Sequence, residues 1–108
     1  MFVGALVDRF PDLMPLLHDH LEVYDELLTH VFMADVTQWA IDLESRGDSE
    51  TLTELLEYLE GKFRDGSAEE REIVGVSFVE NLPDPGEPGR GLVARLGPTL
   101  REQRALLE

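Results

Sequence analysis

The sequence contains no cysteine and no long apolar run. Without thiols the chain can form neither disulfides nor thiolate metal sites, which excludes a secreted scaffold held together by disulfides. The apolar stretch at residues 1–7 has no basic residue before it, and it meets Asp8 and Arg9 too early for a signal peptide or a membrane span. We therefore expect a soluble, cytoplasmic protein.

Basic residues are scarce. Nine Lys and Arg stand against 23 Asp and Glu, which gives a formal net charge of −14 over 108 residues. Such a surplus repels nucleic acid and anionic membranes, so we expect neither as a partner and a basic protein instead. With 43% apolar residues, the chain can still form a hydrophobic core and is not a disordered acidic tail.

The few basic residues gather toward the C-terminus. Residues 1–87 hold 21 acidic and 5 basic side chains, whereas residues 88–108 hold 4 Arg and 2 Glu. The basic residues of this tail are Arg90, Arg95, Arg101 and Arg104. They can pair with the acidic body of the same chain or form an anion site, and we favour the intramolecular pairing.

No complete catalytic or cofactor motif is present. Ser77 lacks the glycine-flanked turn of a hydrolase nucleophile, and the glycine-rich loop at residues 86–91 lacks the pattern that cradles a phosphate. We therefore expect neither an enzyme nor a bound cofactor.

Apolar residues recur at helical spacing along almost the whole chain, whose length is typical of a single domain over residues 1–108. A first helix should end at Pro11, and a second should be capped by Asp12 and carry Pro15 in its first turn. We place the turn to a third helix at residues 22–26.

The third expected helix has the clearest apolar stripe and should be central. Its stripe consists of Leu28, Val31, Phe32, Asp35, Val36, Trp39 and Leu43. Arg46 and Gly47 supply its end, because the cation suits the helix dipole and glycine accepts a left-handed conformation.

Two capping boxes mark the later helices. A fourth helix should begin at Ser49 or Thr51, where Thr51 and Glu54 form a capping box, and a fifth at the box of Ser67 and Glu70. The fifth is apolar around most of its circumference, as expected of a buried helix. Its β-branched residues make a strand the alternative, but no hairpin partner is visible.

Three prolines and three glycines at residues 83–91 predict a surface loop. The basic C-terminal segment at residues 92–108 resumes helical spacing with an interruption at residues 97–98, which indicates one kinked helix or two short ones. The predicted fold is all-α, with about six helices in a bundle or in stacked helical hairpins.

Three histidines lie among acidic residues and raise the question of a metal site: His18, His20 and His30. Imidazole and carboxylate ligands suit zinc or manganese. On one helix, however, His18 and His20 point about 200° apart and cannot share an ion. The pairs His18 with Glu22 and Glu26 with His30 are four residues apart, a spacing that ion pairing on a helix surface explains equally well. We therefore predict no metal site.

Five polar residues are candidates for burial beside the apolar stripes: His30, Asp35, Ser77, Glu80 and Asn81. A buried carboxylate needs a partner. A contact between Glu80 and His30 would be a structural hydrogen bond or an acid–base couple, and we favour the structural one. A metal-dependent hydrolase using His30, Asp35 and Glu80 ranks third among the functional hypotheses.

An acidic band is expected on the exposed side of the third and fourth helices. It comprises Asp42, Glu44, Glu50, Glu54, Glu57 and Glu60. A solvated face is the simplest interpretation. The alternative is a docking site for a basic protein, where complementary charge raises the association rate and the specificity.

Three stretches, at residues 27–36, 55–60 and 76–82, resemble an uncharacterised family of small acidic bacterial proteins. In size, acidity and helical pattern, such proteins are similar to the immunity proteins of bacterial toxin systems, which bind a cognate toxin and block its active site. The resemblance implies an immunity-like inhibitor of a toxin or another basic protein.

A second hypothesis is a structural or adaptor protein that self-associates through Trp39 and the apolar fifth helix. The sequence leaves open whether the protein is a monomer or a homodimer.

Overall fold

The computed structural model describes all 108 residues, and its regular structure is entirely helical. In chain order the elements are α1 (Phe2–Arg9), the 3-10 turn η1 (Pro11–Leu13), α2 (Met14–Tyr24), α3 (Thr29–Arg46), α4 (Ser49–Asp65), α5 (Ala68–Glu72), the π-helical η2 (Ile73–Phe78), the 3-10 turns η3 (Val79–Asn81) and η4 (Arg90–Arg95), and α6 (Pro98–Leu106). The prediction of an all-α fold is confirmed. No helix combines the length and the apolar character needed to cross a lipid bilayer.

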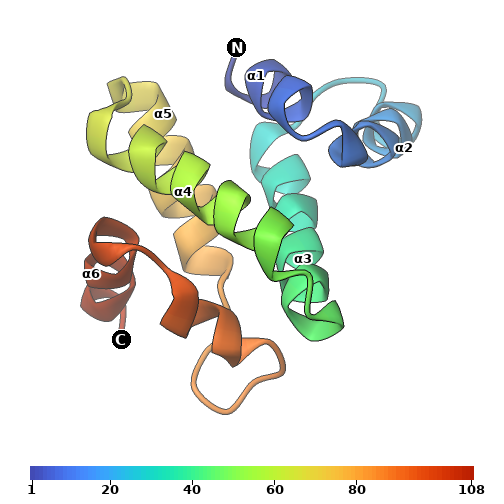
Figure 1. The fold of residues 1–108 in the computed structure, drawn as a ribbon. Helices are drawn as coiled ribbons and strands as arrows, with labels where there is room; N and C mark the ends of the chain where they lie inside the picture. The colour runs from blue at the N-terminus through green and yellow to red at the C-terminus, as the bar shows by residue number, and fades with distance from the viewer.

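One cluster of 24 buried apolar residues forms the core. Helix α3 packs against both α4 and η2, and α4 runs obliquely across the middle of the molecule in Figure 1. The largest fully buried side chains of these three elements are Phe32, Met33, Leu43, Leu52, Leu55, Leu59 and Phe78. The apolar stripes of the third, fourth and fifth helices therefore meet in one place, and the other helices pack around it.

Three apolar residues of the stripe predicted for the third helix lie outside the buried core. Trp39 is only partly buried and packs edge-on against Phe10, with 6.2 Å between the ring centroids. Val31 is 38% exposed, and Leu28 lies just before the helix, partly accessible to solvent. The first turn of α3 thus leaves apolar surface uncovered.

Local signals set several helix ends as predicted. Pro11 follows the end of α1, and Gly47 ends α3 in the left-handed conformation with φ of 76°. Ser67 and Glu70 form the expected capping box: the Ser67 hydroxyl accepts from the Glu70 N–H, and the Glu70 carboxylate accepts from the Ser67 N–H. At these sites the helix end is set by residues that are close together in the sequence.

Two predicted caps are wrong. Asp12 lies inside η1 and makes no capping hydrogen bond, although Pro15 does fall in the first turn of α2. Helix α4 does begin at Ser49, one of the two predicted starts, but the Thr51–Glu54 capping box is wrong: the Asp48 carboxylate caps the helix by accepting from the Thr51 N–H at 3.3 Å. Gly47 ends α3 and the next residue, Asp48, is the N-cap of α4, so the two helices are joined by only two residues.

The fifth helix exists, so the strand alternative is wrong, but its winding changes along its length. It begins as α-helix, widens into the π-helical η2 and tightens into η3. π-Helical turns are uncommon and are found often at functional sites. In this chain the widened turn faces α3.

Residues 83–89 have no regular structure, as predicted, but the predicted loop ends two residues early because Arg90 and Gly91 already belong to η4. The C-terminal segment consists of two short helices, η4 and α6. Of the two alternatives for this segment, the kinked single helix is therefore wrong. Gly97 lies between the two helices, where the chain turns back toward α4.

Candidate functional site

Helix α3 and η2 are joined by a hydrogen bond between His30 Nδ1 and Ser77 Oγ. The Ser77 side chain is buried at 2% exposure, and the Asn81 side-chain amide donates to the Ser77 carbonyl at 2.7 Å. Because Ser77 Oγ is enclosed, the hydroxyl holds the imidazole in place and does not face solvent. The Nε2 atom of His30 has no partner within the chain.

The structure corrects most of the predicted burial of polar residues. Ser77 is buried, but Asp35, Glu80 and Asn81 are exposed, and His30 is exposed apart from its contact with Ser77. Glu80 does not contact His30; Ser77 takes that place. Charged groups stay in water unless they are paired, and the wide π-helical turn presents the small hydroxyl of Ser77 to α3.

The other two histidines have separate roles. His20 is buried at 3% exposure, and its Nε2 accepts a hydrogen bond from the Leu28 N–H at 2.9 Å. This bond ties the end of α2 to the residue before α3 and so fixes the link between them. His18 is exposed. The structure brings no three His, Asp or Glu side chains together in an arrangement that could hold a metal ion.

An open cleft of about 550 Å³ lies between the start of α3 and the helix α5, and we call it the α3–α5 cleft. Its lining consists of Leu27, Leu28, Thr29, His30, Val31, Glu69, Glu72 and Ile73. Four of these side chains are apolar, and two are carboxylates on one edge. Sequence analysis missed the cleft because it assigned the leucine at position 28 and the valine at 31 to a buried stripe.

A signal for the cleft was nevertheless present in the sequence. Two adjacent leucines, Leu27 and Leu28, follow directly after the acidic turn at Asp25 and Glu26. The turn is formed by Asp25 in the left-handed conformation, with φ of 59°, and it ends α2. An apolar pair placed between a turn and a helix start lies outside the regular stripe and is easily left uncovered.

The acidic band is largely exposed. Glu50, Glu54 and Glu57 lie on the outer face of α4, and Asp42 lies exposed on α3, where it accepts from the Gln38 side chain at 3.1 Å. Glu54 is 3.7 Å from the Arg9 guanidinium. Both groups of this pair are about half exposed, so it contributes little.

Glu60 does not belong to the exposed band, which corrects the prediction. It is 7% exposed, and its carboxylate accepts from the Thr99 N–H at 2.7 Å and the Leu100 N–H at 3.4 Å. These are free donors at the start of α6, where the helix dipole also favours an anion. A Cβ on Gly97 would lie 2.1 Å from Glu60 Oε2, so glycine makes room for the carboxylate. Glu60 is a structural residue.

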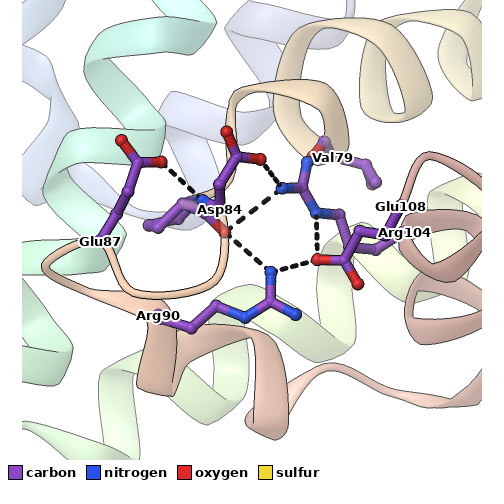
Figure 2. Close-up of polar contacts among 7 residues, drawn as sticks. Val79, Asp84, Glu87, Arg90, Arg104 and Glu108 are labelled. Atoms are coloured by element: carbon purple, nitrogen blue, oxygen red, sulfur yellow. Dashed lines mark hydrogen bonds and ion pairs between the residues drawn. The ribbon is translucent and has the colours of Figure 1, made fainter.

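The arginines of the tail are engaged within the chain, as predicted. Arg104 is 4% exposed and donates to the carbonyls of Val79 and Pro83. It also donates to the Asp84 carboxylate at 2.6 Å, as Figure 2 shows. Arg90 donates to the Pro83 carbonyl and pairs with Glu108.

The two remaining arginines of the tail are also held internally. Arg95 pairs with Glu44 at 3.1 Å, and Arg101 donates to the carbonyls of Ala94 and Leu96. Glu44 is therefore a partner of the tail and is not free for an external cation.

Three carboxylates have a lowered pKa: Glu70, Glu108 and Asp65, the last because of its hydrogen bond with Arg64. The pKa of Glu70 is lowered by the hydrogen bond from the Ser67 backbone N–H and by the Lys62 ammonium, 3.0 Å away. The pKa of Glu108 is lowered by its hydrogen bond with Arg90. None of these three carboxylates lines the α3–α5 cleft.

Ion pairing within the chain is one-sided. Six of the nine basic side chains form ion pairs, and they pair with six carboxylates. Seventeen of the 23 carboxylates are therefore outside any ion pair. The protein offers many free anions and few free cations to a partner.

A family model described as a domain of unknown function, DUF7674, matches residues 3–106. The chain belongs to this family. The prediction of an uncharacterised family is thereby confirmed, and the match extends through the loop and the tail, beyond the three stretches that carried the resemblance. No curated protein and no solved structure matches the chain.

Proposed function

We propose that this member of the DUF7674 family is a small acidic protein-binding module of the cytoplasm that inhibits a basic protein by covering its active surface, in the manner of a bacterial immunity protein. The observation that carries the proposal is the one-sided ion pairing, because fifteen of the carboxylates outside any ion pair are exposed and can meet cations from outside the chain. Free charge of one sign raises both the association rate and the selectivity for a partner of opposite sign.

The contact surface in this proposal is the exposed part of the acidic band: Asp42, Glu50, Glu54 and Glu57. A rigid helix fixes the carboxylates of α4 at regular intervals. If the target is a nuclease, these carboxylates occupy the positions of nucleic-acid phosphates and block access to the basic site. No catalytic group of the inhibitor is required for such occlusion.

The alternative, self-association through Trp39 and the fifth helix, has less support. Trp39 packs against Phe10, and the apolar residues of η2 face the core, except for Val76 at 44% exposure. Each copy has a net charge of −14, so two copies repel each other. These surfaces therefore offer little to a second copy.

The test is a pull-down with the tagged protein from its native cytosol at low and at high salt, with the eluted proteins identified by mass spectrometry. We expect one basic protein that is released by salt and whose activity the purified chain inhibits. Recovery of only further copies of this chain, retained at high salt, would contradict the proposal.

Charge reversal locates the contact. In the triple variant Glu50→Lys, Glu54→Lys and Glu57→Lys, the affinity for the basic target and the inhibition of its activity should both fall at least tenfold. The matched control reverses three exposed carboxylates elsewhere that form no ion pair: Asp12, Asp19 and Glu102. If the control weakens binding as much as the α4 variant, only net charge matters and the assignment of the α4 face is wrong.

A further inference from the structure

The α3–α5 cleft is an apolar hollow in a protein whose charged side chains are mostly acidic. Leu27, Leu28 and Val31 form one side, and the buried Ile73 lies opposite them. At about 550 Å³ the cleft has room for one or two large apolar side chains. The His20 bond to the Leu28 N–H fixes the link that carries two of these leucines.

The edges of the cleft carry negative charge without an internal partner. Glu69 and Glu72 line it from α5, and Asp25 and Glu26 immediately precede its leucine wall. None of these four carboxylates forms an ion pair with a cation of the chain. His30, whose Nδ1 is held by Ser77, also lines the cleft with Nε2 free.

We propose that the α3–α5 cleft is a docking site for a protein segment that places an apolar side chain in the cleft and Lys or Arg side chains against its acidic edge. Charge complementarity selects this occupant: the rim requires cations, and the chain itself has too few free ones to supply a second copy of this protein. An amphipathic basic segment satisfies both the apolar wall and the rim.

This inference goes beyond the proposed function. It concerns a second surface, on α3 and α5, and it requires neither inhibition nor the exposed carboxylates of α4. It assigns to the π-helical turn and the His30–Ser77 bond a positioning role, because they fix the side of α3 that faces the cleft.

The experiment uses a short synthetic amphipathic peptide of leucine and lysine as the probe, added to the ¹⁵N-labelled full chain. A peptide with serine in place of leucine and the same charge is the control probe. We expect amide shifts concentrated at residues 27–31 and 69–73 with the leucine peptide, and weak, dispersed shifts with the serine peptide. Shifts centred on the outer face of α4 with both peptides would overturn the proposal.

Val31→Asp separates the apolar contribution from the charge. The added carboxylate increases attraction to a cationic peptide but removes part of the apolar wall, so we expect binding to fall more than tenfold. The matched control is Met14→Asp, the same kind of change at an exposed residue in the first turn of α2, outside the cleft. Both positions tolerate an acid because each lies near a helix N-terminus.

If Val31→Asp binds the leucine peptide as tightly as Met14→Asp does, charge alone holds the peptide and the cleft is not the site. The double variant Glu69→Gln and Glu72→Gln should weaken binding roughly twofold to tenfold, as expected for two exposed ion pairs. Glu50→Gln with Glu57→Gln changes the net charge equally and should leave peptide binding unchanged. The basic target of the proposed function is absent from these titrations, so failure here leaves that proposal standing, and the reverse also holds.

Discussion

Glu60 reaches from α4 to the start of α6, and its removal should weaken the docking of the C-terminal segment. Its carboxylate accepts from the Thr99 N–H at 2.7 Å and is 7% exposed. A hydrogen bond to a charged group contributes about 1.5–3 kcal/mol, and an anion at a helix N-terminus adds about 0.3–1 kcal/mol. Glu60→Ala should therefore lower the free energy of unfolding by about 2–4 kcal/mol.

Urea denaturation followed by circular dichroism measures this loss. Glu60→Gln retains an acceptor oxygen and should cost about 1 kcal/mol. Glu57→Ala, one turn away and exposed, is the control and should stay within about 0.5 kcal/mol of the unmodified chain. Equal losses for Glu60→Ala and Glu57→Ala would refute the role given to the Glu60 carboxylate.

Gly97 provides an independent check on the same contact. A Cβ there would lie 2.1 Å from Glu60 Oε2 and 2.7 Å from its Cδ, so Gly97→Ala must displace the carboxylate. Combined with Glu60→Ala, the Gly97→Ala change should cost much less than it does alone, because the group it displaces is gone. Strictly additive losses would show that the two residues do not interact.

Three further changes follow from the buried and paired polar groups. Arg104→Ala should cost about 2–4 kcal/mol in urea denaturation and increase amide exchange at residues 83–91, because buried carbonyls lose their donor. His20→Leu should cost about 1–3 kcal/mol by orphaning the Leu28 N–H, whereas His18→Leu should change stability little. The pKa of Glu70 is lowered in the folded chain, so its stabilising contribution is present above the unfolded value near 4.5 and is lost as pH falls through the lower folded value. The difference in urea midpoint between the unmodified chain and Glu70→Gln should accordingly shrink from pH 7 to pH 3, and a constant difference would contradict this linkage.

Helix ends could be predicted from the sequence where neighbours in the chain decide them. Gly47 and the Ser67–Glu70 box act within a few residues, so their patterns were sufficient. Glu60 shows the limit. It follows Leu56 by four residues and thus shares the buried stripe of α4, but its partners at Thr99 and Leu100 are 39 and 40 residues away. The charge of Glu60 predicts a place on the surface. Its burial is possible only because the folded C-terminal segment supplies the two backbone donors.

The candidate site depended even more on long-range packing. The sequence indicates His30 as a candidate and predicts Glu80 as its partner, but the structure supplies Ser77, 47 residues away. An ordinary α-helix was assumed for the fifth segment, and π-helical winding has no simple sequence signature. The α3–α5 cleft also depends on packing between distant segments, because it forms where the link before α3 meets α5. The sequence alone therefore does not predict it.

The π-helical η2 has a consequence for how length can vary among related chains. The loop closed by each hydrogen bond spans one residue more than in an α-helix, because the hydrogen bonds of a π-helix run from i to i+5. A relative with one residue fewer within residues 73–78 can return to α-helix without breaking the segment. The side chains beyond the deletion would then rotate relative to α3, so the Ser77–His30 bond and the extra residue should be gained or lost together.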